Sequence, residues 1–372
     1  MLMSGDLSLY IHIPFCTKKC PYCHFYVVAN SEPLQEMLLT GLCVEWQRLR
    51  AQIEPYRIVS VYFGGGTPSL LTHKRLQTLT NLIRSEAQLS TDCEWTIEAN
   101  PESCSAEDLS FYQSIGLNRI SFGVQSFQDN LLHVLGRTHS SSKAKEAVHR
   151  AHKAGFDNIT IDLMYELPHQ TIDDWHTSLK EACSLPITHI SLYNLTIEPH
   201  TGFARKKEEL EKTLPSPEIC RDMYEMAISE LTNRGFDHYE ISAFCKDNRY
   251  SRHNTGYWTG RPFLGLGPSA FSFFNNRRFQ NTAHLVRWAH LLKDGKSPID
   301  FVDEVSLEER KRELFAVGLR MLCGVEEGSV PDTCRDEVTK LIELGLLCHK
   351  KGRLHLTHKG ILFHDTVASM LI

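Results

Sequence analysis

Short apolar runs alternate with helix-length segments along the first 240 residues of this chain. The runs are rich in β-branched and aromatic residues, which is typical of buried strands. They cover residues 7–13, 59–63, 95–99, 119–122, 159–163 and 189–195, and the segments between them cover 34–52, 73–89, 106–115, 143–154 and 173–184. This alternation predicts an α/β fold with a parallel sheet. Six strand units fit an incomplete (β/α)6 barrel better than a closed barrel of eight.

Several of the predicted helices carry end signals. Ser105 followed by Asp108 predicts a helix start with an acidic first turn. Gly116 and Gly155 each stand just before a predicted strand, where a glycine ends a helix. In barrels of this type the functional groups lie at the carboxyl ends of the strands, so the loops after the strands are the expected place for a site.

The pattern changes after residue 240, so the chain divides into three predicted parts. Residues 1–240 form the barrel, residues 241–300 form an extension rich in glycine and aromatic side chains, and residues 301–372 form a small C-terminal domain. The elements expected in the last part are a helix that Ser306 caps and that runs to about residue 322, a helix at 336–344, a hairpin turn at Lys351–Gly352 and a final helix at 361–371. Their order resembles a winged helix.

The charge balance argues against a nucleic-acid partner, although winged helices often bind DNA. The chain has 40 basic and 45 acidic side chains and a net charge of -5, whereas a nucleic-acid surface needs a basic excess. No window of about 18 apolar residues occurs, and the first 14 residues lack the features of a signal peptide. We therefore expect no nucleic acid, no transmembrane segment and a cytoplasmic location.

Three of the twelve cysteines lie within eight residues, directly after the first predicted strand. Cys16, Cys20 and Cys23 have the spacing C-x3-C-x2-C, which brings three thiolates to one metal centre. Four cysteines would complete a 4Fe–4S cluster, and three leave one iron open to another ligand. Lys18 and Lys19 are expected to lower the thiol pKa and to offset the negative charge of a cluster.

Two other interpretations of these cysteines remain open. His24 would complete a zinc site with them, although structural zinc usually takes two pairs of ligands from separated segments and no second pair follows. In the second interpretation, the three cysteines lie close together by coincidence and bind no metal. The remaining nine are scattered singly, as buried free thiols are.

Glycine or polar residues close four of the predicted strands. Residues 64–68, Gly-Gly-Gly-Thr-Pro, allow the backbone to approach a ligand closely, or else form a tight turn. Glu98 and Gln125 end apolar strands, where a polar side chain needs a partner. Asp162 interrupts a strand otherwise suited to burial, so we expect it to meet a ligand hydroxyl, a cation or an internal salt bridge.

The cysteine motif, with the aromatic Tyr22 before its third cysteine, resembles the signature of the radical S-adenosylmethionine (SAM) superfamily. The sequences at 10–15, 123–127 and 161–168 resemble one branch, which contains the oxygen-independent coproporphyrinogen dehydrogenases and the HemW haem chaperones. The resemblance covers nearly the whole chain. It implies that the methionine part of SAM binds the open iron and that the reduced cluster releases a 5′-deoxyadenosyl radical from SAM.

The resemblance also implies which residues bind SAM. Tyr22 would lie beside the adenine of the cofactor. The other residues expected to contact SAM are Tyr10, Gly65, Gly66, Thr67, Glu98, Gln125, Arg137 and Asp162.

Two features distinguish this chain from the dehydrogenases, and a third resembles the chaperones. The dehydrogenase motif has a further cysteine where this chain has Phe25, and it follows a long extension, whereas nine residues precede Tyr10 here. Residues 253–258, His-Asn-Thr-Gly-Tyr-Trp, match the HNxxYW haem motif of the chaperones. His253 is a natural axial ligand for haem iron, and the two aromatic residues offer flat apolar surface. We expect a surface separate from the barrel here, unless His253 is a loop histidine and the aromatic residues are core.

Two functions follow from the resemblance. In the first, the chain is a haem chaperone that binds a 4Fe–4S cluster, SAM and haem or a porphyrin. It then passes haem to acceptor proteins, and an electron donor such as flavodoxin or ferredoxin reduces the cluster. In the second, it is an enzyme that oxidatively decarboxylates coproporphyrinogen III in haem biosynthesis. Phe25 and the short amino terminus favour the first.

Overall fold

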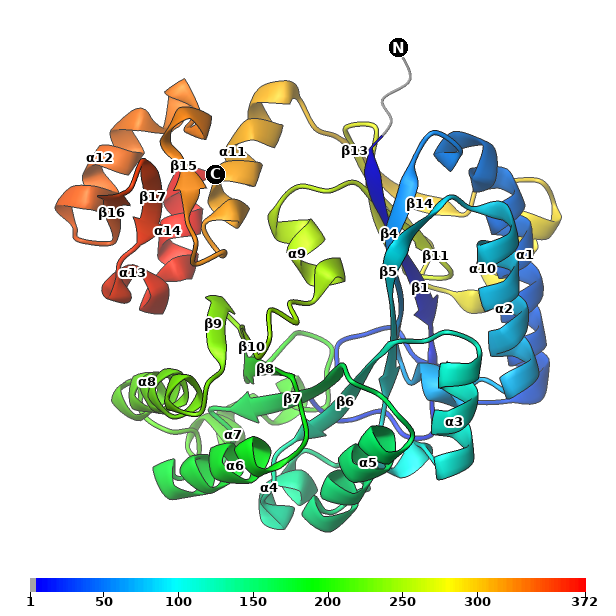
Figure 1. The fold of residues 1–372 in the computed structure, drawn as a ribbon, viewed down its shortest axis with the longest axis horizontal. Helices are drawn as coiled ribbons and strands as arrows, with labels where there is room; N and C mark the ends of the chain where they lie inside the picture. The colour runs from blue at the N-terminus through cyan, green and yellow to red at the C-terminus, as the bar shows by residue number, and fades with distance from the viewer. Residues whose placement is uncertain (1–4) are drawn as a thin grey trace.

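The computed structural model describes residues 5–372 (Figure 1). One sheet of twelve strands contains all the predicted barrel strands, which lie parallel in the order β1-β4-β5-β6-β7-β8. Their bounds are β1 Asp6–Ile13, β4 Arg57–Gly65, β5 Leu89–Ala99, β6 Arg119–Gln125, β7 Ile159–Tyr165 and β8 His189–Asn194. The sheet curves with its helices on the outside (Figure 1), which confirms the α/β fold and the incomplete barrel.

Five of the helices around the barrel lie at the predicted segments, whereas the helices that begin at Asp129 and Lys207 match none of them. The helices around the barrel are α1 Glu32–Ile53, α2 His73–Glu86, α3 Ala106–Ser114, α4 Asp129–Val134, α5 Ser141–Lys153, α6 Ile172–Ser184, α7 Lys207–Glu211 and α8 Pro217–Asn233. The expected start of α3 is confirmed, because the Ser105 hydroxyl accepts from the Asp108 amide at 3.1 Å and the Asp108 carboxylate accepts from the Ser105 amide at 2.8 Å. The expected length of α2 is wrong: it ends at Glu86, because Leu89 already belongs to β5.

The two faces of the barrel strands differ in polarity because side chains alternate along a strand. The outer face packs on the helices through residues such as Leu9, Val61 and Ile97, which are fully buried. The inner face carries hydroxyls and carboxylates, among them Tyr62 and Glu98, which are hydrogen-bonded to each other. An apolar core therefore surrounds a polar barrel interior.

Residues 237–304 add six further strands to the same sheet. Two strands extend it beyond β8, and four extend it beyond β1. They are β10 Ala243–Cys245 and β9 Asp237–Glu240, then β11 Phe263–Leu266, β12 Phe271–Phe274, β13 Arg277–Asn281 and β14 Ile299–Glu304. The predicted boundary at residue 300 falls within β14. Helix α9 Arg252–Trp258 lies in the opening between the two edges (Figure 1), and α10 Leu285–Lys293 packs on α1.

The C-terminal domain has its own three-stranded sheet and its own core. Its elements are α11 Leu307–Gly318, β15 Val325–Glu326, α12 Arg335–Glu343, β16 Leu347–Lys350, β17 Arg353–Leu356, α13 His358–Leu362 and α14 His364–Leu371. The predicted hairpin at Lys351–Gly352 is confirmed, and both residues have positive φ. Two predicted helix lengths are wrong. α11 ends at Gly318, and the last helix is split at Phe363, whose φ of -113° and ψ of 29° leave the helical region.

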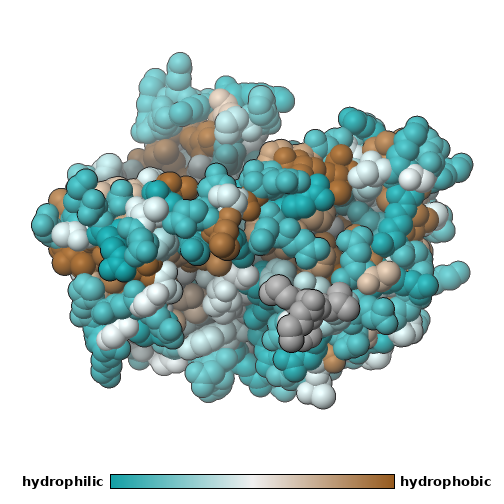
Figure 2. All heavy atoms as spheres, turned by 90° about the horizontal axis from the view of Figure 1, so that it is seen from above, coloured by the Kyte–Doolittle hydropathy of each residue, from teal (hydrophilic) through white to brown (hydrophobic). Residues whose placement is uncertain are grey.

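The face of the molecule drawn in Figure 2 is mostly hydrophilic, with apolar side chains in separate patches. Phe25, Phe363 and Ile372 are among the large apolar side chains exposed to solvent. Among residues 5–372, no helix is both long enough and apolar enough to cross a membrane.

Candidate cluster and cofactor site

The three predicted cluster cysteines lie on one loop at the carboxyl end of β1. Cys16 ends the short strand β2 Phe15–Cys16, which pairs with β3 Val28–Ala29, and Cys20 and Cys23 follow on a turn. All three are free and partly exposed. The Cys16 sulfur lies 3.6 Å from the Thr67 hydroxyl, and the Arg137 guanidinium donates to the Cys20 sulfur at 3.6 Å. The fold thus brings the cysteines together with Thr67 and Arg137.

Burial has a larger effect than the neighbouring lysines on the pKa of the Cys16 and Cys23 thiols. It raises the pKa of both Cys16 and Cys23 above the ordinary value. Lys19 and Arg137 lower the pKa of Cys23, but by less than burial raises it. Lys19 therefore lowers the pKa of Cys23 as expected, but burial outweighs this effect and the pKa is raised overall. Iron binding itself would displace the thiol protons.

The donor set suits an iron–sulfur cluster. Thiolates are soft ligands, and each cysteine of a 4Fe–4S cluster binds a different iron. Within the described part of the chain, no three His, Cys, Asp or Glu side chains are placed to hold a single metal ion. His24, the fourth ligand of the alternative zinc site, stacks on Phe25 with ring centroids 4.6 Å apart. Arg137 supplies the positive charge that favours a negatively charged cluster.

The glycine loop after β4 is hydrogen-bonded to the cysteine loop along its backbone. The Gly66 amide donates to the Ile13 carbonyl at 2.8 Å, and the Thr67 amide donates to the Phe15 carbonyl at 2.7 Å. A Cβ atom at Gly66 would lie 2.6 Å from the Phe15 carbonyl oxygen. We expected glycine here for the approach of a ligand, but contacts within the chain already require it at residue 66.

Glu98, near the end of β5, accepts two hydrogen bonds from β4. The Tyr62 hydroxyl donates to its Oε1 at 2.8 Å, and the Gly65 amide donates to its Oε2 at 3.1 Å. Gly65 has a φ of +110°, which glycine adopts without strain. Burial raises the pKa of Glu98 to about 7 despite these donors, and the nearby Asp162 adds to the rise.

Asp162 faces the same interior from β7. Its carboxylate accepts from the Ser121 hydroxyl at 3.3 Å, so its partner is a neutral hydroxyl and not the salt bridge of the alternative interpretation. Burial raises the pKa of Asp162 to about 6, against the opposing charge of Arg119. Two carboxylates with raised pKa values therefore share one polar interior. A cationic ligand between them would favour their charged forms.

Asn100 connects the cysteine loop to the strand ends, and the sequence did not predict it. Arg137 Nη2 donates to Asn100 Oδ1 at 2.6 Å and to the Gly123 carbonyl at 2.7 Å, and Asn100 Nδ2 donates to Thr67 Oγ1 at 3.2 Å. Asn100 comes two residues after Glu98. Asn100 directly follows the end of β5, where a polar side chain lies in the loop at the strand's carboxyl end, and this place in the sequence was the signal that could have found it.

The remaining predicted SAM contacts are Tyr10, Tyr22 and Gln125. The Tyr10 hydroxyl is 2.9 Å from His12 Nδ1. The Tyr22 ring lies 6.2 Å from the Phe203 ring. Gln125 ends β6 with a φ of +68°, which is unusual for a residue other than glycine. Their contacts with SAM stay predictions.

His253 lies inside the barrel, so the expectation of a separate surface is wrong. The residue is on α9 and is 1% exposed. Its Nδ1 is 3.1 Å from the Ser60 hydroxyl and its Nε2 is 2.8 Å from the Tyr257 hydroxyl. The ring lies 4.8 Å from the Tyr62 ring. In this conformation both ring nitrogens already have partners, so the residue does not fit the role of an iron ligand without rearrangement.

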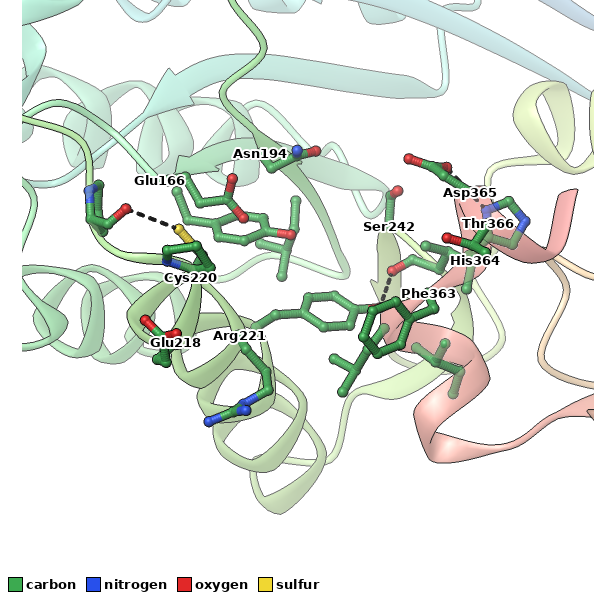
Figure 3. Close-up of a pocket in the computed structure, with 18 of the residues that line it drawn as sticks. Glu166, Asn194, Glu218, Cys220, Arg221, Ser242, Phe363, His364, Asp365 and Thr366 are labelled. Atoms are coloured by element: carbon green, nitrogen blue, oxygen red, sulfur yellow. Dashed lines mark hydrogen bonds and ion pairs between the residues drawn. The ribbon is translucent and has the colours of Figure 1, made fainter. Parts of the chain in front are cut away.

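A cavity, which we call the outer cleft, lies between the barrel wall and the C-terminal domain (Figure 3). Its volume is about 690 Å³. The stacked rings of Tyr165 and Tyr224, with centroids 6.2 Å apart, and the half-exposed Phe363 contribute to its walls. His364 is 8% exposed, and neither ring nitrogen forms a hydrogen bond within residues 5–372; the Asp365 carboxylate is 3.5 Å from Nδ1.

Comparison with known proteins decides the family. Residues 10–182 match the radical SAM superfamily, and residues 305–363 match the HemN C-terminal domain. A Bacillus subtilis protein named haem chaperone HemW is 34% identical over 97% of both chains. HemW proteins of Haemophilus influenzae and Escherichia coli are 38% identical over 98% of both chains and 32% identical over 100% of both. This chain belongs to the HemW family.

The HemW family lies within the radical SAM superfamily, whose members are expected to carry a 4Fe–4S cluster and SAM. A solved structure, coproporphyrinogen III oxidase (HemN) from Escherichia coli, has a TM-score of 0.86 and covers 98% of this chain and 90% of its own. It is 22% identical to this chain, so the likeness shows the fold alone. The sequence likeness to HemW therefore outweighs the structural likeness to the oxidase in assigning the branch.

Proposed function

We propose that this chain is a haem chaperone that binds a 4Fe–4S cluster, SAM and haem, and transfers haem to acceptor proteins. The observation that carries the proposal is the 32–38% identity to three proteins named haem chaperone HemW, along essentially the whole chain. Phe25 supports it, because this side chain is half exposed beside the cysteine loop, where the dehydrogenases have another cysteine.

In this proposal, the cluster and SAM bind at the end of the barrel where the cysteine loop lies. Cys16, Cys20 and Cys23 hold three irons. The bound cofactor supplies radical chemistry, and the protein positions it. Glu98 and Asp162 offer carboxylates to the positive groups of SAM, and the other proposed contacts are Tyr10, Tyr22, Gly65, Gly66, Thr67, Gln125 and Arg137.

Haem has two candidate positions in this proposal. Ligation by His253 requires α9 to move, because iron would have to replace Ser60 or Tyr257 as the partner of a ring nitrogen. The outer cleft offers aromatic walls without movement of an element. Burial lowers the pKa of His364, which keeps its ring in the neutral form that binds iron, and a change of rotamer would turn the ring toward a ligand in the cleft.

An anaerobic haem titration, beside an assay of coproporphyrinogen III conversion, tests the function. We expect about one haem per chain and no conversion in the presence of reductant and SAM. Efficient conversion without stoichiometric haem binding would support the dehydrogenase instead. His253→Ala and His364→Ala identify the ligand, because loss of the iron ligand shifts the Soret band. His149→Ala, on the exposed face of α5, is the matched control.

The partners in this proposal are a haem-acceptor protein and a one-electron donor such as flavodoxin or ferredoxin. A cytoplasmic location is part of it, because all twelve cysteines are free and that compartment keeps thiols reduced. Reduction of the cluster by purified flavodoxin, followed by the cluster's spin signal, tests the electron donor.

A further inference from the structure

We propose that His253 is a positioning residue of the cofactor site: it sets the place of Tyr62, and through Tyr62 the place of the Glu98 carboxylate. The inference rests on the proposed function, in which SAM binds beside Glu98. It gives the HNxxYW segment a role inside the barrel that does not require haem.

Helix α9 is anchored to the strand that carries Glu98. The Arg252 and His253 amides both donate to the Glu94 carboxylate, at 3.1 and 3.0 Å. Glu94 and Glu98 lie four residues apart on β5, so they face the same side of the sheet. Glu94 is 5% exposed, and besides these amides it has Arg119 at 4.0 Å. Moving α9 would take two hydrogen-bond donors from a buried carboxylate, which is costly.

The His253 ring joins α9 to the inner face of β4. It bridges the Ser60 hydroxyl at 3.1 Å and the Tyr257 hydroxyl at 2.8 Å. A neutral imidazole has one donor and one acceptor nitrogen, and each hydroxyl can take the complementary role. Burial, with the positive charges of Arg261 and Arg119, lowers the pKa of His253 to about 3. The ring is therefore neutral near pH 7 and suited to this bridge.

The Tyr62 ring packs against both the His253 ring and the Tyr10 ring. It lies 4.8 Å from the His253 ring and 6.2 Å from the Tyr10 ring. A Cβ atom at Gly64 would lie 2.8 Å from Tyr62 Cε1, so the ring is closely confined there. The Tyr62 hydroxyl donates to Glu98 at 2.8 Å. Removing the imidazole would open a cavity on one side of the ring, and both the ring and the carboxylate would lose their fixed position.

The other end of α9 meets the C-terminal domain. The Arg320 guanidinium lies 4.3 Å from the Trp258 ring centroid, and Arg310 Nη2 donates to the Gly260 carbonyl at 2.9 Å. Arg310 is on α11, and Arg320 follows that helix. A continuous series of contacts therefore leads from the C-terminal domain through α9 to Glu98.

SAM titration of the cluster-reconstituted protein tests the role of His253. We expect His253→Ala and Tyr62→Phe each to weaken SAM binding about tenfold, and the double variant to lose little more than either, because both act through Glu98. The iron content and the cluster signal without SAM should match the wild type. Leu179→Ala, at a fully buried position on α6, is the control for a general loss of packing and should leave SAM affinity unchanged.

Tyr257→Phe provides a test that keeps the histidine, in case His253→Ala does not fold. It removes the hydroxyl that holds Nε2, and we expect SAM binding about threefold weaker. Unchanged affinity in His253→Ala or in Tyr257→Phe, or losses that simply add in the double variant, would overturn the proposal. Loss of the haem ligand in His253→Ala with SAM affinity intact would also overturn it. A wild-type protein that binds no SAM would refute the proposed function instead.

Discussion

The Arg137 guanidinium donates a hydrogen bond to the Cys20 sulfur at 3.6 Å, which fixes a positive charge beside the candidate cluster. The Nη2 atom of the same side chain donates to Asn100 Oδ1 at 2.6 Å and to the Gly123 carbonyl at 2.7 Å. Its position is therefore set by two strand ends, and the charge cannot easily turn away when the cluster changes its oxidation state.

We expect Arg137→Met to lower the reduction potential of the cluster by roughly tens of millivolts, because reduction adds negative charge that the guanidinium stabilises. A redox titration followed by the cluster's spin signal measures the shift. Arg150→Met, on α5, removes a partly exposed arginine and serves as the control. An unchanged potential in Arg137→Met would contradict an effect of this charge on the cluster.

Alanine at Cys16, Cys20 or Cys23 should abolish cluster assembly, whereas Cys183→Ala should not. Reconstitution of the wild type with iron and sulfide should give about four irons per chain. Iron analysis and the visible spectrum check both statements. A full cluster in any of the three variants would contradict the assignment, and one tightly held zinc would support the alternative site with His24.

SAM affinity should depend on pH through Glu98, whose pKa burial raises to about 7. SAM carries positive groups, so it selects the ionised carboxylate. Affinity should therefore be flat above pH 7 and fall by up to about tenfold per pH unit below it. Asp162, with a pKa of about 6, should steepen the fall at lower pH. Binding isotherms at several pH values measure this, and Glu98→Gln should bind more weakly and lose the dependence near pH 7.

Gly66→Val and Asp162→Ala should separate cluster binding from SAM binding. Gly66→Val places a side chain against the Phe15 carbonyl, so it should disturb the cysteine loop, cost about 2 kcal/mol or more in stability and reduce iron content. Asp162→Ala removes a carboxylate bonded to Ser121, away from that loop, so it should weaken SAM while the cluster stays intact. Normal iron content in Gly66→Val would contradict the loop contact.

The barrel could be predicted from the sequence because its signals are local. Each strand is a short β-branched or aromatic run, and the start of α3 depends on Ser105 and Asp108, three residues apart. The cysteine motif can also be recognised in the sequence from the spacing of its three residues. In these cases the residues that interact are close in sequence, so their pattern is visible without the fold.

Other features depend on contacts between distant segments and could not be predicted in this way. His253 is hydrogen-bonded to Ser60, which is 193 residues away in the sequence, and no local pattern shows which strand α9 will contact. The overall rise in the pKa of Cys23 could not be predicted either, because Lys19 is visible in the sequence and the burial of Cys23 is not. Tyr62 was missed for a related reason, since its partner Glu98 lies on the next strand of the barrel.

The pairing of Gly66 with Ile13 and of Thr67 with Phe15 has a consequence for how such chains diverge. Inserting or deleting a residue in either loop would shift the register of the other, so the two loops can change length only together. New binding properties can arise with less disturbance at the sheet edges, among β9 to β14, or in the C-terminal domain. Variation in ligand preference among relatives should therefore accumulate there, while the spacing from Ile13 to Cys16 and from Gly64 to Thr67 stays constant.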